Sequence, residues 1–535
     1  MSRPNRRMLT LPSALELTQG ADPIRLRKKK DRFLFMTYNL LAQALVRRDM
    51  FPHASQKALR WKFRRQNLLQ ELLTHPPDLA CLQEVDFWDE VYYPILTKAG
   101  YETAYYKNVN KKHGCAIIWR KSRFEKVDQL AFDYDDIGQP TFMTGNVGLM
   151  VGLRPVLSKT ENPDPNADMV LAEDDDEGSA KEETSKEDDD TDIPGGILVA
   201  TTHLFWRPDG SYERLRQASI MLNKVKEWNQ KLNFTVLLGG DFNTTPRDAA
   251  YRAMTRNEMP PHQIPNLEQW LVDEVNRMQN ADGTKTDQQG DIEVDQLTAQ
   301  AEQLGLGETT SGPDMTNGKK KEDGKDRASD LPYRAPPTGI ILPKSIPAKG
   351  SLAATEEGQE PESTIADPKD FADSEDPKIK SLATLTASTS GGEDAPVIAP
   401  LEAFTPPQDL LATIETHSRC ISIYGQYEAL TKDDPAETST ATAAATVEEK
   451  STATKAHTAH THGEPIFTNY ATWFKDTLDY VYLYDEPVPE NGARLVPLRL
   501  LEIPDKSFLG HGLPDENFSS DHICLVVEFA ILRRT

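Results

Sequence analysis

The chain has 535 residues, of which 38% are hydrophobic and 27% charged, and its formal net charge is −24 at pH 7. It is longer than a typical single domain, which predicts either two domains or one domain with long insertions. No stretch approaches the ~18 uninterrupted apolar residues of a transmembrane helix, so we expect no membrane partner.

The charge is distributed unevenly along the chain. Residues 1–30 carry eight basic and two acidic side chains, which predicts a basic disordered tail. Residues 156–194 carry three basic and 15 acidic side chains, whereas 31–155 carry 17 basic and 14 acidic ones. Because the segments with regular apolar patterns are mildly basic, the negative total does not exclude a polyanionic partner. The four cysteines show no metal-binding spacing and favour a reducing compartment. We expect a cytoplasmic or nuclear location, and a mitochondrial one less.

Apolar periodicity predicts a series of strands and two helical segments. The helical patterns cover 56–74 and 212–232. Strands mixed with a few helices indicate an α/β core in which both faces of the sheet are covered. The expected strands, in chain order, are 33–41, 78–85, 115–120, 146–153, 196–206, 234–240, 478–484, 494–503 and 522–532.

Three segments have a composition that cannot bury enough apolar surface to fold. They are the acidic stretch 160–194 and the low-complexity stretches 257–415 and 431–463. Within the second, NLEQWLVDEVNRM at 266–278 has the pattern of an isolated helix. We therefore expect one folded unit over 31–535, interrupted by disordered insertions.

Polar side chains stand where several predicted strands end, which is where α/β folds place their ligands. In VLLGGDFNTTP (236–246), a buried strand ends at two glycines that are followed by Asp241 and Asn243. Carboxylate and amide oxygens without thiolates favour Mg²⁺, or Mn²⁺, over zinc. Each residue alone also fits a turn former or a core histidine, so only their joint occurrence indicates a site. The other candidates are Asn39 in TYNLL, Glu84 in CLQEV, His203 in TTHLFW, Asp479 in LDYVYL, and Asp521 and His522 in FSSDHI.

A set of motifs in a fixed order resembles those of the endonuclease/exonuclease/phosphatase superfamily. The motifs are TYNLLA, LQEVD, THLFW, GDFN, FTNYATWFKDTLDY and SSDHI. The chain is most similar to the nocturnin, Angel and carbon-catabolite-repression deadenylase branch, and within it to fungal Ngl-type RNA exonucleases. The resemblance implies a four-layer α/β sandwich of the deoxyribonuclease I type, with two mixed sheets flanked by helices, and a single catalytic domain over 31–535.

The resemblance also implies which residues serve the metal and the water. Glu84 is expected to be the principal metal ligand, with Asn39 beside it. Asp241 would orient or deprotonate the attacking water, and Asn243 would hold that water and the phosphate. Asp521 would assist the metal or the water.

The remaining roles concern the phosphate and the terminal base. By the same resemblance, His522 would contact the scissile phosphate and would be oriented by Asp479. His203 would bind a non-bridging phosphate oxygen. Pro208 and Phe474 match positions that pack against a terminal adenine, although both also fit ordinary loop packing, and stacking on an aromatic ring tolerates any base.

The expected activity is Mg²⁺-dependent 3′→5′ hydrolysis of RNA from its 3′ end to 5′-mononucleotides, in poly(A) tail removal or RNA 3′-end processing. His113 stands where many relatives carry Asp, so adenine preference stays open. Two alternatives are a phosphatase for a small phosphorylated nucleotide and a catalytically inactive RNA-binding scaffold. The acidic insertions also offer surfaces for protein partners.

Overall fold

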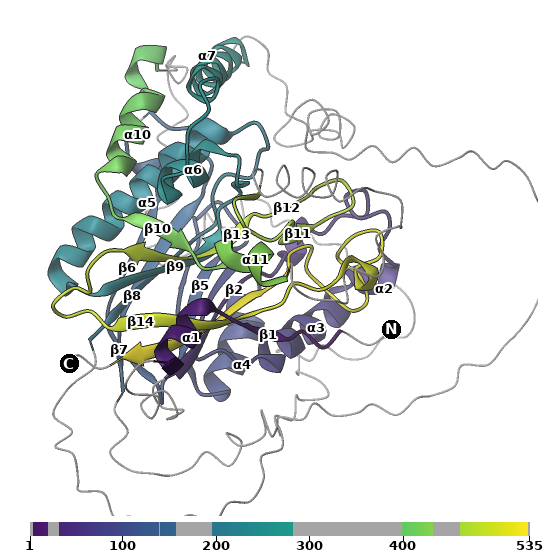
Figure 1. Cartoon of the computed structure of the whole chain (residues 1–535). Coiled ribbons are helices and arrows are strands. Elements are labelled where there is room, and N and C mark those ends of the chain that lie inside the picture. The colour runs from purple at the N-terminus through teal and green to yellow at the C-terminus, as the bar shows by residue number, and fades with distance from the viewer. Residues whose placement is uncertain are drawn as a thin grey trace, which may run out of the picture.

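The computed structural model describes residues 4–19, 32–138, 140–156, 195–281, 399–431 and 461–532 (Figure 1). The predicted insertion at 160–194 lies outside the described residues, as does the greater part of the predicted insertions at 257–415 and 431–463. The described segments form two β-sheets with helices on their outer faces, which confirms the predicted fold class.

The first sheet is mixed and has seven strands. Its parallel pair is β2 with β3, and the neighbours of this pair run antiparallel to it. Every residue of β3 is buried, as expected for a strand covered on both faces. In spatial order, the strands are β1 (Met8–Thr10), β14 (Arg494–Leu501), β15 (Leu525–Leu532), β2 (Arg32–Asn39), β3 (Leu79–Val85), β5 (Gly114–Arg120) and β4 (Tyr101–Tyr106).

The second sheet is also mixed and has six strands, with β8 and β9 as its parallel pair. A separate short hairpin joins β11 (Asn469–Tyr470) to β12 (Lys475–Asp476). In spatial order, the strands of the second sheet are β10 (Arg419–Ser422), β13 (Asp479–Asp485), β9 (Thr235–Asp241), β8 (Ile197–Thr202), β7 (Val147–Pro155) and β6 (Phe124–Asp133).

The two sheets pack face to face through one apolar cluster. Phe35 of β2 and Leu237 of β9 are both fully buried in it. The two glycines at the end of β9 permit close packing in two directions, Gly239 toward the first sheet and Gly240 toward β8 of the same sheet. A Cβ atom on Gly239 would lie 2.6 Å from the Phe35 ring, and one on Gly240 would lie 2.6 Å from the carbonyl oxygen of Thr202. A side chain on Gly239 would therefore separate the two sheets, and one on Gly240 would disturb the contact with β8 next to Asp241.

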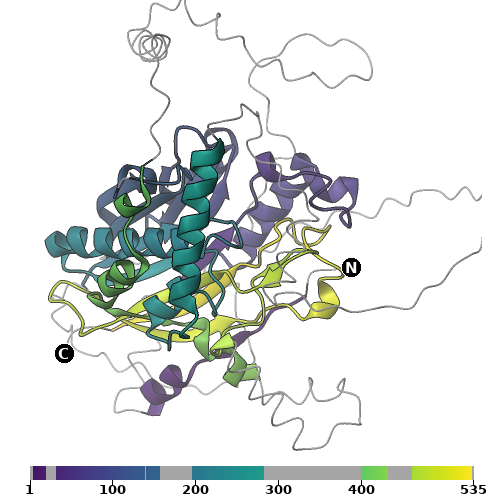
Figure 2. The same cartoon turned by 90° about the horizontal axis from the view of Figure 1, so that it is seen from above.

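Helices cover the outer face of each sheet and complete four layers (Figures 1 and 2). One apolar cluster joins α5, α6, α7 and α10 to the second sheet, and another joins α3 and α4 to the first. None of the described helices is long and apolar enough to cross a membrane. The helices are α1 (Pro12–Gln19), α2 (Gln56–Leu59), α3 (Trp61–Thr74), α4 (Tyr93–Lys98), α5 (Ser211–Leu232), α6 (Ala249–Thr255), α7 (Gln263–Ala281), α10 (Pro407–Glu415) and α11 (Tyr427–Thr431).

The start of the chain corrects the prediction of a disordered tail over 1–30. β1 pairs with β14, and Leu11 is fully buried against the core. The guanidinium of Arg6 donates hydrogen bonds to the carbonyl oxygens of Glu502 at 2.6 Å and Cys524 at 2.8 Å. The prediction was wrong for this part because charge composition does not report a pairing with residues almost 500 positions away.

The segment at 257–415 needs a similar correction at both ends. α7 is not an isolated helix, because Leu267, Leu271 and Val275 are buried in the outer cluster of the second sheet. α10 packs in the same cluster through Leu410 and Ile414. The helical pattern of α7 was visible in the sequence, but the face that receives its apolar side chains belongs to other elements.

The predicted strands and helices are confirmed, with ends that shift by a few residues. Within the two described sheets, the strands that the apolar pattern did not indicate are β1, β4, β6 and β10, and each is an edge strand; the short strands β11 and β12 of the separate hairpin were not indicated either. In β6, residues 125–129 are exposed. An edge strand of this kind carries polar residues and lacks a continuous apolar run.

Candidate active site

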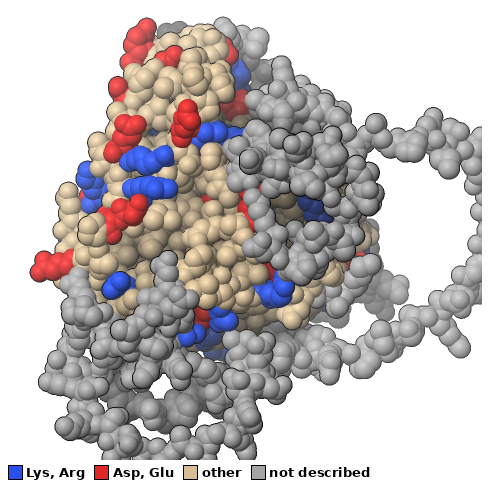
Figure 3. Space-filling model, in the orientation of Figure 1, with Lys and Arg blue, Asp and Glu red and all other residues tan. Residues whose placement is uncertain are grey.

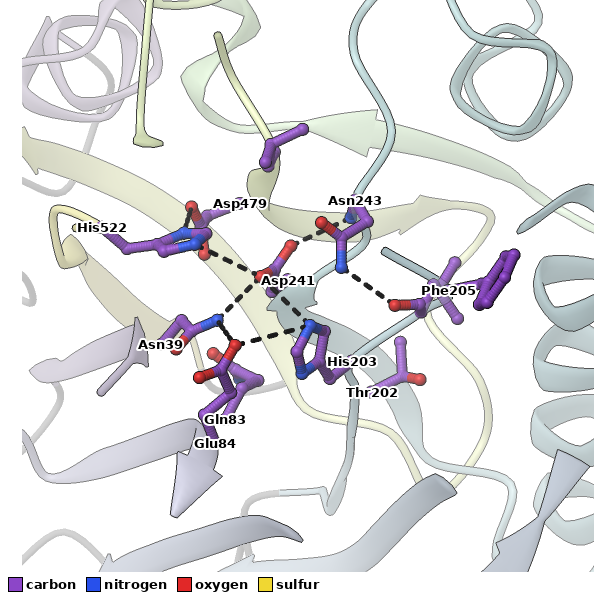
Figure 4. Close-up of polar contacts among 12 residues, drawn as sticks. Asn39, Gln83, Glu84, Thr202, His203, Phe205, Asp241, Asn243, Asp479 and His522 are labelled. Atoms are coloured by element: carbon purple, nitrogen blue, oxygen red, sulfur yellow. Dashed lines mark hydrogen bonds and ion pairs between the residues drawn. The ribbon is translucent and has the colours of Figure 1, made fainter. Parts of the chain in front are cut away.

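Four of the candidate residues stand at the ends of the two parallel strand pairs. Asn39 ends β2, Glu84 lies near the end of β3, Asp241 ends β9, and His203 directly follows β8. Carboxyl ends of parallel strands meet at one edge of a sheet, and the face-to-face packing brings the two edges together. Figure 4 shows the side chains of these residues pointing toward one another.

The amide of Asn39 connects the two sheets. Its Nδ2 donates to Oε1 of Glu84 at 3.0 Å and to Oδ2 of Asp241 at 2.9 Å. Its Oδ1 accepts the backbone N–H of Leu41 at 2.9 Å. The structure thus turns the nitrogen of Asn39 toward the acids. In this conformation Asn39 holds two carboxylates in place and does not offer its oxygen as a ligand.

Glu84 is held in a fixed, ionised state. Its backbone has φ +53°, and its Oε2 accepts the N–H of Ala42 at 3.0 Å. Burial alone would raise its pKa, but His203, His113 and the Asn39 hydrogen bond lower the pKa to about 2. Nε2 of His203 lies 3.8 Å from Oε1 of Glu84. A residue that adopts a left-handed backbone without being glycine is strained, and such strain is concentrated at functional sites.

Asp241 and Asn243 form a tight turn at the end of β9. Oδ1 of Asp241 accepts the N–H of Asn243 at 2.9 Å, and Nδ2 of Asn243 donates to the carbonyl of Leu204 at 2.9 Å. Asn243 has φ +49°, a conformation that Asn tolerates better than most residues. Burial raises the pKa of Asp241, although His522 and the Asn39 hydrogen bond oppose that effect. Nε2 of His203 lies 3.6 Å from Oδ2 of Asp241.

His522 faces Asp241 from the first sheet and is bound to Asp479 of the second. Its Nδ1 lies 2.8 Å from Oδ2 of Asp479, and its Nε2 lies 3.6 Å from Oδ2 of Asp241. Burial opposes the charged form, but Asp479 and Asp241 together raise the pKa of His522 well above its usual value. The two carboxylates therefore favour the protonated form of the ring, in which both nitrogens donate hydrogen bonds.

The loop that precedes His522 is anchored to the loop that follows β2. The hydroxyl of Ser520 donates to the carbonyl of Asn39 at 2.7 Å. Arg64 of α3, which is fully buried, donates to the carbonyls of Ser519 at 2.9 Å and Leu40 at 3.0 Å. Asp521 is buried between them, burial raises its pKa to about 6, and its Oδ1 has no hydrogen-bond partner within the described part of the chain.

The donor set fits a hard divalent cation. Among the described residues, Asp241, Asp479 and His522 lie near enough together to share an ion, with ligand atoms within 4.8 Å of one another. However, Nδ1 of His522 is hydrogen-bonded to Asp479 and its Nε2 stands 3.6 Å from Asp241, so we regard the histidine as a partner of these two acids and not as a ligand of an ion. The ionised carboxylate of Glu84 and the unpaired buried oxygen of Asp521 are the better donors for Mg²⁺ or Mn²⁺.

The two residues predicted to contact a base lie in loops near this edge. Pro208 is half-buried between β8 and α5, and its carbonyl accepts Nη2 of Arg214 at 3.0 Å. Phe474 is half-buried in the β11–β12 hairpin, with its ring centroid 6.0 Å from that of Trp473. In the described structure neither side chain contacts the polar cluster. His113, by contrast, lies beside it, with its ring centroid 6.4 Å from that of His203.

Sequence reasoning missed two residues that hold the site in shape. Thr468 donates to Asp479, and Arg64 ties together the loops that carry Asn39 and Asp521. Thr468 lies within the FTNY motif, which was the available signal. Nothing in the local pattern of α3 distinguishes Arg64 from the solvent-facing basic residues around it.

Comparison with known proteins shows the family of the chain. The model of the family described as "Endonuclease/Exonuclease/phosphatase family" matches residues 36–302. The chain belongs to this family. Its relatives place it in the branch of the nocturnin, angel and carbon catabolite repressor 4 proteins.

Two relatives are yeast proteins. This chain is 37% identical to "RNA exonuclease NGL2" of Saccharomyces cerevisiae over 242 residues. The match covers 42% of this chain and 42% of the relative. The chain is 37% identical over 255 residues to "Probable RNA exonuclease C9B6.11c" of Schizosaccharomyces pombe, which covers 47% of this chain and 42% of the relative. The matches thus span less than half the length of these relatives. A solved structure of ANGEL2, described as a 2′,3′-cyclic phosphatase, aligns over 99% of both chains with 17% identity and a TM-score of 0.48.

Proposed function

We propose that the protein is a divalent-cation-dependent 3′→5′ exoribonuclease that hydrolyses RNA to 5′-mononucleotides. The observation that carries the proposal is the convergence of Glu84, Asp241 and the His522–Asp479 pair at one edge of the two sheets. Asn39 holds Glu84 and Asp241 on one side, and the His522–Asp479 pair faces Asp241 from the other. Phosphodiester hydrolysis needs both charge neutralisation and in-line positioning of a water, and this arrangement can supply them.

Each side chain receives a role from its contacts. Glu84, with Asp521, would hold the cation, which would neutralise charge on the phosphate when bound. Asp241 would orient the attacking water and accept its proton, since burial raises its pKa. Asn243 and His203 flank Asp241 and would bind phosphate oxygens.

His522 would contribute positive charge to the phosphate opposite the cation. Its Nε2 lies toward Asp241 because Asp479 fixes the other ring nitrogen. An imidazolium in this position stabilises the developing negative charge of the transition state, which is usually the largest catalytic term. Asp479 acts on the reaction only through this ring.

The choice of RNA as substrate is supported by the names of the yeast relatives. Pro208 and Phe474 would contact the terminal base, and the 3′ end would belong to a poly(A) tail or to an RNA that is processed at its 3′ end. His113, which neighbours His203, would influence which base is preferred.

The deciding experiment uses two RNAs labelled at the 5′ end, one ending in oligo(A) and the other in a different base. We expect a ladder that shortens from the 3′ end in Mg²⁺ and no products in EDTA. Glu84→Gln should lower kcat/KM about 10³-fold, since it removes the carboxylate charge that holds the cation. Glu90→Gln, which makes the same change at an exposed position, should leave the rate unchanged.

The products discriminate the alternatives. Nucleoside monophosphates from RNA support the proposal, and a comparison of the two RNAs measures adenine preference. Free inorganic phosphate from a small nucleotide, with intact RNA, would indicate a phosphatase. RNA that is bound but never cleaved under any metal condition would indicate a scaffold.

A further inference from the structure

A strongly basic segment follows directly on the loop that carries Asn39. Residues 43–66 contain seven basic side chains and a single acidic one, Asp49, in a chain whose net charge is −24. One of the seven, Arg64, is fully buried and structural. Lys57 is paired with Glu516 at 2.9 Å. The others are Arg47, Arg48, Arg60, Lys62 and Arg65.

Two of these cations, Arg48 and Arg60, line a groove. It has a volume of about 670 Å³ and is lined by Gln43, Val46, Arg48, Gln56, Leu59 and Arg60. Arg48 and Arg60 are both exposed. The Arg48 guanidinium donates one hydrogen bond, to the carbonyl of Ala54, and in the described structure the side chains of Arg60, Lys62 and Arg65 form no hydrogen bond or ion pair. Their charge is therefore available to a ligand.

One residue of the groove wall adjoins, along the chain, a residue that is hydrogen-bonded to the candidate site. Gln43, in its wall, adjoins Ala42, whose N–H is bound to the Glu84 carboxylate. Gln43 also accepts Nη1 of Arg64 at 2.9 Å and donates to the carbonyl of Leu59 at 3.2 Å. Because Ala42 and Gln43 are consecutive, the groove wall begins next to the residue that holds the Glu84 carboxylate.

An aromatic pair flanks the same surface. Trp61 adjoins Arg60 and stacks on Phe87, with ring centroids 4.7 Å apart and planes at 22°. Phe87 is 41% exposed, which is unusual for a large apolar ring, and it follows Glu84 by three residues in a left-handed conformation with φ +49°. Cationic grooves that track a backbone, next to aromatic platforms, are typical of surfaces that bind single-stranded nucleic acid without reading its sequence.

We infer that this groove binds the RNA strand upstream of the scissile end, with Arg48 and Arg60 on its phosphates and Phe87 available to stack on a base. The inference rests on the proposed function, because it names where the rest of the substrate lies when its 3′ end is at Glu84. Phosphate contacts of this kind give affinity that depends on length and salt and does not depend on sequence.

The test compares a 20-nucleotide RNA with a dinucleotide. In the double variant Arg48→Gln/Arg60→Gln, kcat/KM for the 20-mer should fall about tenfold, and that for the dinucleotide should stay within about twofold. The plot of log(kcat/KM) against log[salt] should become shallower by about 1.4, because two contacts to a single strand are lost. Arg48→Lys/Arg60→Lys keeps the charge and should restore most of the activity. The control variant Lys98→Ala/Lys121→Ala removes two exposed cations outside the groove, and Lys121 directly follows the end of β5. It should leave kcat/KM unchanged for both substrates.

A binding measurement separates this inference from the proposed function. Fluorescence anisotropy of the labelled 20-mer in EDTA reports the groove whether or not the RNA is hydrolysed. Weaker binding by the Gln variant, with normal binding by the Lys variant, supports the groove as the RNA-binding surface. This holds even if no RNA is cleaved, and in that case only the exoribonuclease proposal fails. The inference would be overturned if the Gln variant lost kcat/KM equally for the 20-mer and the dinucleotide. It would also be overturned if RNA binding and the salt slope of the Gln variant were unchanged.

Discussion

The hydroxyl of Thr468 has its hydrogen bonds fully determined by its surroundings. It accepts the N–H of Leu478 at 2.9 Å and that of Asp479 at 3.0 Å, which uses both lone pairs. Its single proton can then go only to Oδ2 of Asp479, at 2.7 Å. The same oxygen binds Nδ1 of His522. Thr468 is therefore a positioning residue that fixes the carboxylate that orients the imidazolium.

Replacement of Thr468 tests this role. Thr468→Val keeps the shape of the side chain and removes its proton donor. A hydrogen bond to a charged group contributes about 1.5–3 kcal/mol. Its loss should therefore lower kcat about 10- to 100-fold. KM should change little, because the substrate does not touch this residue. Thr468→Ser should restore kcat. Steady-state kinetics on RNA would contradict the role if Val and Ser variants were equally slow.

A second buried residue, Glu464, makes stability depend on pH. It is 1% exposed, its Oε1 accepts the hydroxyl of Tyr251 at 2.8 Å, and its Oε2 has no hydrogen-bond partner among the described residues. Burial raises its pKa to about 7. The folded protein thus holds this proton more tightly than the unfolded chain does, and stability falls as the pH rises from about 4.5 to 7.

Glu464→Gln should remove this dependence. At pH 8 the variant should be more stable than the natural protein by about 1–3 kcal/mol, and at pH 5 the two should be similar. Thermal unfolding at both pH values measures the difference. Glu90→Gln, at an exposed site, is the control and should follow the natural protein at both pH values. If Tm decreased equally from pH 5 to pH 8 in all three proteins, Glu464 would not be the source of the pH dependence.

At the scale of the element, α7 shows how a helix from a polar segment joins the core. Leu267, Leu271 and Val275 are buried, and Arg207 in the loop before α5 binds Glu274 at 2.9 Å. Lys, Arg, Asp and Glu side chains are interspersed on the face that carries α7 and α10 (Figure 3). The outer side of the helix is solvated, and its inner side contributes to the same cluster as α5 and α10.

Truncation of one buried side chain measures the packing of α7. Leu271→Ala should lower the free energy of unfolding by about 2–4 kcal/mol through lost burial and the cavity that remains. Gln269→Ala, on the exposed side, should change it by less than about 0.5 kcal/mol. Urea unfolding followed by tryptophan fluorescence would detect the difference. A similar small change for both variants would mean that the helix is not part of the cooperative core.

At the scale of the whole molecule, the described elements on either side of the long insertion meet each other. Gln408 of α10 donates to Glu268 of α7, and both helices pack on α5. Residues 284–396 lie between them along the chain, outside the described residues. The helices should therefore depend on each other and on the core more than on the sequence that connects them.

Two deletions test this dependence. Replacement of 284–396 by a flexible Gly/Ser linker should leave Tm nearly unchanged, because loop entropy varies only slowly with loop length. Deletion of 260–413 removes buried side chains of α7 and α10 and should lower Tm by several degrees. Differential scanning calorimetry of both variants measures the result, and comparable Tm losses would show that the connecting segment itself stabilises the fold. RNA hydrolysis and partner capture by the first variant would also measure what that segment contributes to activity and partners.

The sequence by itself determined which strands are buried and which polar residues end them. Apolar runs report burial, and glycines followed by Asp241 report a strand that ends close to another layer, so the α/β class and most candidate residues followed from local pattern. The edge strands, and the packing of residues 4–19 and of α7, did not follow, because their polar faces carry no such pattern.

Only the tertiary structure decided how these residues act on one another. The contacts of Asn39 with Asp241, of Thr468 with Asp479 and of His522 with both acids join positions from different strands and sheets. The orientation of an amide, the charge of an imidazole and the course of a basic groove depend on which groups lie within a few ångströms. That proximity is set by the packing of the two sheets, which no local stretch of sequence contains.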